Sequence, residues 1–108
     1  MREKCNVTLI GTILGEPQRG RTKGNPIKNT EPIDTLNLEL AVTRTFRGQP
    51  TTDRYPVGIY GKQAITGAEL LKRGAQVQVQ GEVRLIPCVR DGVHFDRISI
   101  AARTFDLI

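Results

Sequence analysis

The sequence contains few of the residues that metal centres need. Its 108 residues include one histidine, His94, and two cysteines, Cys5 and Cys88, which stand far apart and form no Cys-x-x-Cys pair. A zinc site therefore lacks ligands, and we expect neither a metal nor any other cofactor. The first residues include no apolar stretch typical of a secretory signal, so we expect reduced thiols and a cytoplasmic location.

Catalytic motifs are equally scarce. His94 has no nearby serine or cysteine arranged for nucleophilic attack. Gly20 and Gly24 flank basic residues, but the Gly-Lys-Ser/Thr sequence that cradles a phosphate does not follow. No apolar run approaches the roughly 20 residues that span a bilayer. We therefore expect no catalytic residue, no enzymatic activity and no membrane contact.

Positive charge is what the chain has in excess. Sixteen lysines and arginines stand against eleven acidic residues, which gives a net charge of +5. A basic chain of this size favours an anionic partner, nucleic acid first, although solubility alone would also explain a modest excess. At this length we expect one domain with one core, covering residues 1–108.

Hydrophobic periodicity predicts mostly strands. Leu36, Leu38, Leu40 and Val42 alternate with polar residues, and the same alternation runs from Val77 to Leu85, as expected for half-buried strands. The expected strands cover residues 5–14, 34–46, 54–60, 76–86 and 94–107, and the expected helix covers 62–72, where apolar residues recur at helical spacing.

The remaining segments are rich in glycine, proline and polar residues, and we expect residues 15–32 to form a loop and residues 47–53 and 87–92 to form turns. Asp91-Gly92 is a hairpin signal, and Pro56 places part of the third strand at an edge or bulge. Three strands, a helix and two strands are the order of the OB-fold, an all-β, five-stranded Greek-key barrel with a short helix between strands three and four. A split five-stranded α+β sheet is the competing topology.

Four stretches carry a family resemblance. They are residues 6–11, residues 40–43, the aromatic-Gly-Lys motif at 59–62, and residues 68–81 with their Lys-Arg-Gly-x-x-Val-x-Val-x-Gly pattern. In these the chain resembles the bacterial single-stranded DNA-binding protein family over nearly its whole length. The resemblance implies an OB-fold that binds single-stranded DNA in replication, recombination or repair, by stacking bases on aromatic side chains within a basic groove.

The resemblance also implies which residues stack. Phe46 occupies a tryptophan position of the family, and Tyr60 a phenylalanine position. Two further tryptophan positions fall on Arg54 and Cys88; the guanidinium of Arg54 still stacks on a base, whereas Cys88 cannot replace an indole. Tyr55 takes a neighbouring position that tends to be histidine near a subunit contact. The predicted stacking residues are Phe46, Tyr60, Arg54, Tyr55 and Phe95.

Basic residues gather in the expected loops and at strand ends. In an OB-fold the loop after strand one and the loop between strands four and five flank the face made by strands two and three, so these charges would surround one groove. The alternative is that they only solubilise the loops. The predicted phosphate contacts are Arg19, Arg21, Lys23, Lys28, Arg44, Arg47, Lys62, Arg84 and Arg90.

Partners and alternatives follow from the same comparison. The resemblance implies a nucleoid-associated homo-oligomer, a tetramer or else a dimer, paired through first strands; residues 7–14 are apolar on both alternations. The chain ends at Ile108 without the acidic C-terminal tip that recruits repair proteins in typical members, so we expect no such recruitment. The nearest alternative is the tail-less primosomal N protein, a replication-restart accessory acting mainly through protein contacts. An RNA-binding OB module is another.

Overall fold

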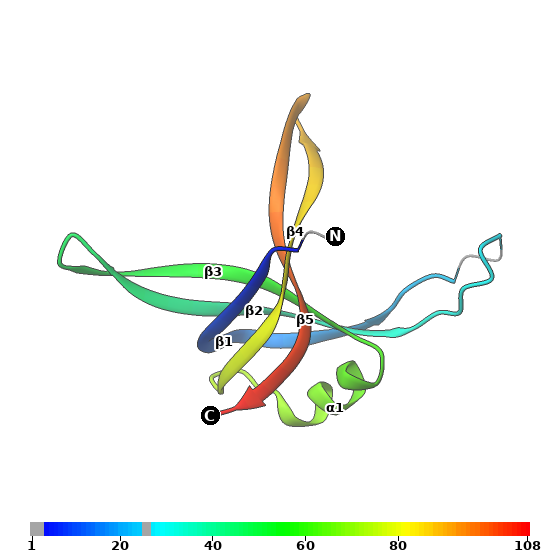
Figure 1. Ribbon diagram of the computed structural model, residues 1–108, viewed down its shortest axis with the longest axis horizontal. Coiled ribbons are helices and arrows are strands. Elements are labelled where there is room, and N and C mark those ends of the chain that lie inside the picture. Colours follow the sequence, from blue (N-terminus) through cyan, green and yellow to red (C-terminus); the bar gives the residue numbers. More distant parts are fainter. Residues whose placement is uncertain (1–3, 25–26) are drawn as a thin grey trace.

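The fold, seen in a computed structural model that describes residues 4–24 and 27–108, is a closed barrel. Its strands follow one another around the barrel in the order β1-β2-β3-β5-β4 (Figure 1). The predicted OB-fold is therefore confirmed, and the competing open sheet is wrong. The elements are β1 (Asn6–Arg21), β2 (Asp34–Phe46), β3 (Gln49–Tyr60), α1 (Lys62–Leu70), β4 (Gln76–Arg90) and β5 (Val93–Leu107).

The core lies inside the barrel and contains the residues that alternation predicted. Leu36, Leu38 and Leu40 of β2 are buried, as are Val77 and Val79 of β4, and each alternates with polar residues on the outer surface. The remaining buried hydrophobic residues are Leu9, Ile13, Val57, Ile59, Ala64, Leu71 and Ile100. Burying a side chain of this size contributes about 1.5–3 kcal/mol, so this cluster is the main source of stability.

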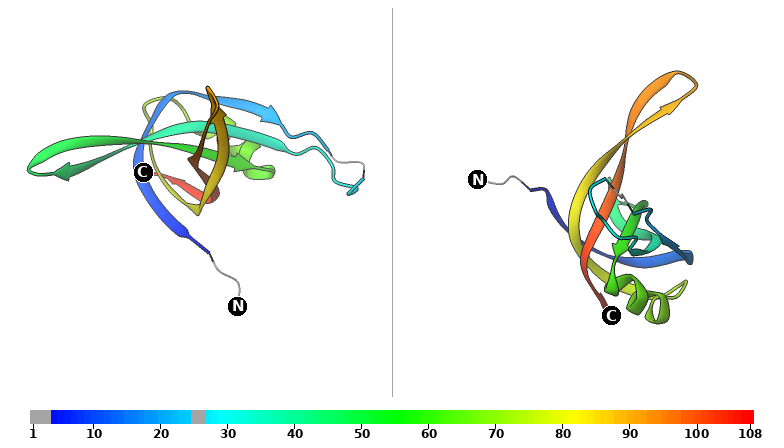
Figure 2. Two further views of the ribbon diagram at one scale, coloured as in Figure 1. Left: turned by 90° about the horizontal axis from the view of Figure 1, so that it is seen from above. Right: turned by 90° about the vertical axis from the view of Figure 1, so that its right-hand side faces the viewer.

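Helix α1 closes one end of the barrel (Figure 2, right). Its buried residues are Ala64 and Gly67. A Cβ built on Gly67 would lie 3.1 Å from Leu36 Cδ2 and 3.3 Å from Leu71 Cδ1, so glycine permits the close approach of helix and barrel. The glycine that weakens the helix as an isolated segment is therefore what lets it pack. No helix in the described part of the chain is long and apolar enough to cross a membrane.

Strand β1 is longer than predicted, and much of the expected loop at 15–32 is wrong. The strand bends at Gly15, whose φ is +67°, and its register with β2 shifts between Leu14 and Gln18. Pairing then resumes and continues to Arg21, opposite Asp34. Turn-forming residues at 15–17 mark a bulge here rather than the end of the strand.

Two hairpins are also longer than predicted. Of residues 47–53 only Arg47 and Gly48 form the turn, with φ of 51° and 76°. Of residues 87–92 only Asp91 and Gly92 do so, with φ of 51° and 78°. Two-residue hairpin turns whose twist matches that of the strands have positive φ at both central residues. The hairpin predicted at Asp91-Gly92 is therefore confirmed.

These hairpins form two arms that extend beyond the barrel, the β2–β3 arm at the left of Figure 1 and the β4–β5 arm at its top. The β1–β2 ribbon extends on the opposite side from the β2–β3 arm. The edge position predicted from Pro56 is confirmed, because β5 pairs with β3 only at Val57 and Gly58. Pro56, with no N–H to donate, lies just outside that short contact.

Gly81 provides a test of barrel closure. A Cβ built on this buried residue would overlap the carbonyl oxygen of Ala101 and lie 2.9 Å from Ala102 Cα, at the register shift between β4 and β5. We expect Gly81→Ala to lower the free energy of unfolding by about 1–3 kcal/mol, measured by urea titration, because backbone must move to accommodate it. Gln78→Ala on the outer side of the same strand is the control. Equal urea midpoints for Gly81→Ala and Gln78→Ala would contradict the close packing of Gly81 against β5.

Candidate nucleic-acid interface

The tip of the β2–β3 arm carries an aromatic ring between two cations. Phe46 is 53% exposed and lies opposite Gln49, next to the turn. The guanidinium carbon of Arg44 is 5.5 Å from the centre of its ring, and that of Arg47 is 5.2 Å away. An exposed ring beside arginines offers a stacking surface for a base and donors for its phosphates.

Arg44 is held in place by an ion pair. Its Nε donates to Oδ2 of Asp53 at 2.6 Å. This hydrogen bond and the charge of the carboxylate raise the pKa of Arg44 above the ordinary value for arginine. Arg44 is therefore a permanent cation beside Phe46.

The outer face of β3 carries a second aromatic group. Tyr60 pairs with Thr35 and Arg54 pairs with Ala41, whereas the neighbouring pair Leu36 and Ile59 is buried in the core. Alternation therefore places Tyr60 and Arg54 outside the barrel, and Tyr60 is 41% exposed. The sequence already indicates this, because Tyr60 follows the buried Ile59 and successive strand residues point to opposite faces.

A glycine sets the position of the Tyr60 ring. A Cβ built on Gly58 would lie 2.7 Å from the Tyr60 hydroxyl oxygen and 3.1 Å from Cζ. The ring therefore lies along the strand over Gly58, where any other residue would displace it. Gly58 is a site residue that the sequence analysis missed. Its spacing two residues before an outward aromatic was the available signal, since such neighbours share one face of a strand.

The β4–β5 arm has two chemically different faces. Its register pairs Arg84 with Ser99, Ile86 with Arg97, Cys88 with Phe95 and Arg90 with Val93, so these side chains share one face. The other face carries Leu85, Pro87, Val89, His94, Asp96 and Ile98, and has no arginine or lysine. Arg90 and Arg97 thus lie next to Phe95, which is 40% exposed, and Arg84 lies further along the same face, nearer the barrel.

Arg97 belongs to this arginine face, although the sequence analysis did not select it. Counting residue pairs outward from the Asp91-Gly92 turn would have placed it beside Ile86 and Phe95. The sequence analysis ended the fourth strand at residue 86, and the pairing beyond that point was therefore not considered.

A hollow joins the arm to the barrel. It has a volume of about 190 Å³ and is lined by Pro56 of β3 and by Ile86, Cys88, Arg97, Ile98 and Ser99 of the arm. Pro56 pairs with Glu39 and lies between Arg54 and Gly58 along β3. The outer face of β3 and the arginine face of the arm therefore meet at one concave surface, which we call the β3–arm groove.

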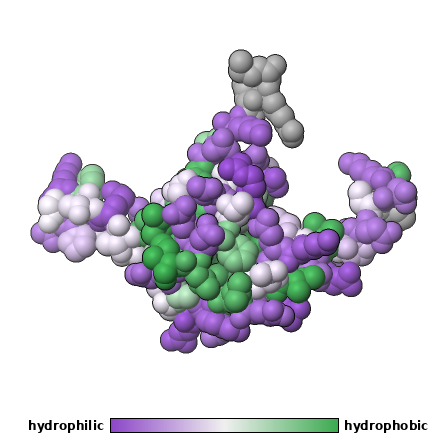
Figure 3. Space-filling view, turned by 60° about the horizontal axis from the view of Figure 1, so that its bottom comes forward, coloured by the Kyte–Doolittle hydropathy of each residue, from purple (hydrophilic) through white to green (hydrophobic). Residues whose placement is uncertain are grey.

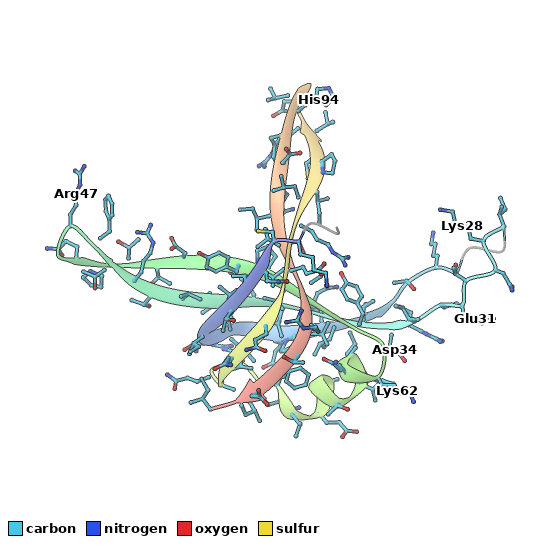
Figure 4. The ribbon with its side chains drawn as sticks, in the orientation of Figure 1. Lys28, Glu31, Asp34, Arg47, Lys62 and His94 are labelled. Carbon is cyan, nitrogen blue, oxygen red and sulfur yellow. The ribbon has the colours of Figure 1, made fainter. Side chains whose placement is uncertain are left out.

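Other predicted site residues lie elsewhere. Arg19 and Arg21 are on the extended part of β1, where Arg21 Nε is 3.6 Å from Asp34 Oδ1, and Lys23 and Lys28 follow in the adjoining loop. Figure 4 shows Lys28 and Arg47 at opposite ends of the molecule, and Lys62 at the start of α1. The predicted phosphate contacts are therefore distributed over three projections and the helix start, rather than placed around one groove.

Tyr55 lies on the other face of β3 from two of the predicted stacking residues. It pairs with Leu40, is partly buried and packs against the core cluster. Its ring is therefore on the opposite side of β3 from Arg54 and Tyr60.

A second pocket, of about 470 Å³, lies between α1 and the end of β5, lined by Lys62, Gln63, Thr66, Leu70, Thr104, Phe105 and Asp106. In Figure 3 hydrophobic side chains gather on the central body, whereas hydrophilic ones cover much of the two lateral projections. The pocket includes neither Phe46 nor Tyr60, and it is separate from the β3–arm groove.

The closed five-stranded barrel with its single helix defines an OB-fold protein, and its exposed aromatic and arginine side chains are of the kind that binds nucleic acid. The chain belongs to the Single-strand binding protein family, which it matches over residues 5–108. The family predicted from the sequence motifs is therefore confirmed.

One curated relative agrees with this assignment, and one solved structure shares the fold. The chain is 33% identical over 78 residues to "Single-stranded DNA-binding protein 2" of Clostridium acetobutylicum, a match that covers 70% of this chain and 54% of the relative. The chain thus spans about half the length of that curated relative. Its fold is similar to that of a small single-stranded DNA-binding protein from Streptomyces coelicolor, with a TM-score of 0.71 at 18% identity, over 99% of this chain and 96% of the other.

The contact between Gly58 and Tyr60 gives a prediction. In Gly58→Ala the added methyl group should push the Tyr60 ring off the strand, at little cost in stability because the far end of the side chain can move. We expect affinity for oligo-dT to fall about twofold to tenfold, measured by fluorescence anisotropy, since part of one stacking contact is lost. If Gly58→Ala weakens binding equally when Tyr60 is already alanine, the ring is not what the methyl group displaces.

Proposed function

We propose that this chain binds single-stranded DNA without catalysis, in replication, recombination or repair. One observation carries the proposal: the hollow of the β3–arm groove is lined by Arg97 of the arm and Pro56 of β3. Phe95, Arg84 and Arg90 share the face of Arg97, and Tyr60 and Arg54 share the outer face of β3 with Pro56. Aromatic faces and cations along a shared concave surface suit a strand whose bases are unpaired and whose backbone is anionic.

Physical chemistry favours a sequence-tolerant mode of binding. Every base has a π-face, and stacking on an aromatic side chain is worth about 1–3 kcal/mol per base. Arginines contribute by neutralising phosphates, so affinity should fall as salt rises. Under this proposal Tyr60, Phe95 and Arg54 stack with bases in the groove, whereas Arg84, Arg90 and Arg97 contact phosphates.

Phe46 and Arg44 lie, by register, on the opposite face of the β2–β3 ribbon from Arg54 and Tyr60. In this proposal the strand leaves the groove and crosses the edge of the β2–β3 arm, where Phe46 supplies another stacking surface and Arg44 and Arg47 supply further cations. Secondary phosphate contacts in the same proposal are Lys62, which follows the end of β3, and four basic residues of the β1–β2 ribbon. These four are Arg19, Arg21, Lys23 and Lys28. Tyr55 supports the arm from its core side and makes no stacking contact in this proposal.

Phe46→Ala and Tyr60→Ala test the proposal directly. Both rings are largely outside the core, so each change should weaken oligo-dT binding by about 1–3 kcal/mol while the melting temperature stays nearly unchanged. Anisotropy titration gives the affinities and calorimetry gives the melting temperatures. Duplex of the same length should bind more weakly, because its bases are already stacked on one another.

The controls separate stacking from folding and DNA from RNA. Leu40→Ala, inside the core, should lower the free energy of unfolding by about 2–5 kcal/mol. This variant provides the reference for a change that acts on folding. A large fall in the melting temperature of the two aromatic variants, with unchanged affinity per folded molecule, would rule out stacking at these rings. Tighter binding of oligo-U than of oligo-dT would favour an RNA-binding module instead.

We also propose that the chain forms a homo-oligomer, a tetramer or else a dimer, through β1. Residues 6–11 pair with β4 on one side, and pairing with β2 begins only at Thr12, which leaves one edge open in the described chain. Ile10 in this segment is 56% exposed. An open edge with an apolar side chain favours pairing with another strand, and a second copy presents the same edge.

Light scattering at micromolar concentration measures the oligomeric state. We expect a mass at least twice that of the 12.0 kDa chain. Ile10→Lys should shift the mass toward the monomer, because a charged side chain at the edge opposes pairing. A monomer in the unmodified protein would contradict the proposed oligomer while leaving DNA binding to be judged from the titrations.

A further inference from the structure

The ion pair between Arg44 and Asp53, at 2.6 Å, is shorter than the pairs Arg21–Asp34, Arg54–Glu39 and Arg84–Glu82. Arg44 lies opposite Thr51, and Asp53 lies two residues further along β3, so the pair crosses the arm diagonally on one face. Their side chains are 51% and 32% exposed, in an arm that has no core of its own. Surface ion pairs of this kind contribute little to stability, so stability alone does not account for this pair.

The two arginines beside Phe46 differ in how they are held. Arg44 is fixed by the 2.6 Å contact to Asp53, whereas Arg47, in the turn, has no carboxylate within salt-bridge distance in the described part of the chain. Holding a long side chain still costs rotamer entropy, and an ion pair made before a ligand arrives removes that cost from binding. Of these two arginines, Arg44 is thus the one that is positioned in advance.

The atom that makes the contact matters as well. A guanidinium has five N–H donors, and Asp53 accepts from the single one on Nε. The four donors of the two terminal NH₂ groups remain for a phosphate, and no hydrogen bond from them is made within the described residues. Asp53 thus orients the guanidinium without occupying the donors that bind phosphates.

We propose that Asp53 is a positioning residue of the binding site: it holds Arg44 beside Phe46, so that a base stacked on the ring has its phosphate within reach of the free NH₂ groups. This inference rests on the proposed single-stranded DNA binding. The negative charge of Asp53 would then favour binding of an anionic strand, because it orients Arg44.

The sign of one mutational effect tests the proposal. Asp53→Ala removes a negative charge, so simple electrostatics predicts tighter binding of oligo-dT. Positioning predicts the opposite, a loss of about threefold to tenfold, because Arg44 is no longer oriented. Anisotropy titrations at fixed salt measure the affinities. Tighter or unchanged binding by Asp53→Ala overturns the inference.

Three further variants separate positioning by Asp53 from a general effect of its charge. Asp96→Ala removes the same charge from the β4–β5 arm, on the face opposite its arginines and where Asp96 has no salt bridge within the described residues, and should tighten binding. Asp53→Glu keeps the carboxylate and should bind like the unmodified chain. In Arg44→Ala the further change Asp53→Ala should cause no additional loss, since Asp53 acts through Arg44. An equal loss with and without Arg44 overturns the inference.

The ring itself can be monitored. The chain contains no tryptophan, so Phe46→Trp introduces a single fluorescent reporter at the tip of the arm. Oligo-dT should quench this reporter, and should quench it less when Asp53→Ala is added. Equal quenching at saturation in both variants overturns the inference. Absence of any binding by the unmodified chain overturns the proposed function, which is a different outcome.

Discussion

The barrel depends on one strand having two partners. β1 pairs with β4 through residues 6–12 and with β2 from Thr12 onward, and this change of partner closes the sheet. Gly11 permits the change, because a Cβ there would overlap the carbonyl oxygen of Ala41 on β2. Every projection starts from this closed frame, and the short pairing of β3 with β5 at Val57 and Gly58 sets the position of Tyr60 relative to the β4–β5 arm.

The candidate site is built mainly from register. Antiparallel pairing decides which residues share a face, and it places the three arginines of the β4–β5 arm together with Phe95. The same rule leaves the opposite face without arginine or lysine. One hairpin thereby presents all its arginines on one face, which borders the groove, and none on the other.

The sequence was informative where one face of a strand is buried. Alternation around Leu38 and Val79 predicted two strands and the core they form, because burial imposes a period of two. It failed in the arms, where both faces meet solvent and no such period is required, so residues 49–53 and 87–90 were assigned to turns. The same division holds for the site residues. Tyr60 could be placed by alternation and Gly58 by its spacing from Tyr60, whereas Asp53 and Arg97 required knowledge of strand pairing.

The arms have a consequence for the energetics of binding. A two-stranded ribbon without a core is held by its cross-strand hydrogen bonds, its tight turn and surface side-chain contacts, so it opens locally at a lower free energy than the barrel. Amide hydrogens near Phe46 and Phe95 should therefore exchange with solvent faster than those near Leu40. A ligand that contacts both arms and the barrel would reduce these motions, and the loss of conformational entropy would oppose binding. The affinity of such a surface is then governed as much by the stiffness of its hairpins as by the side chains they carry.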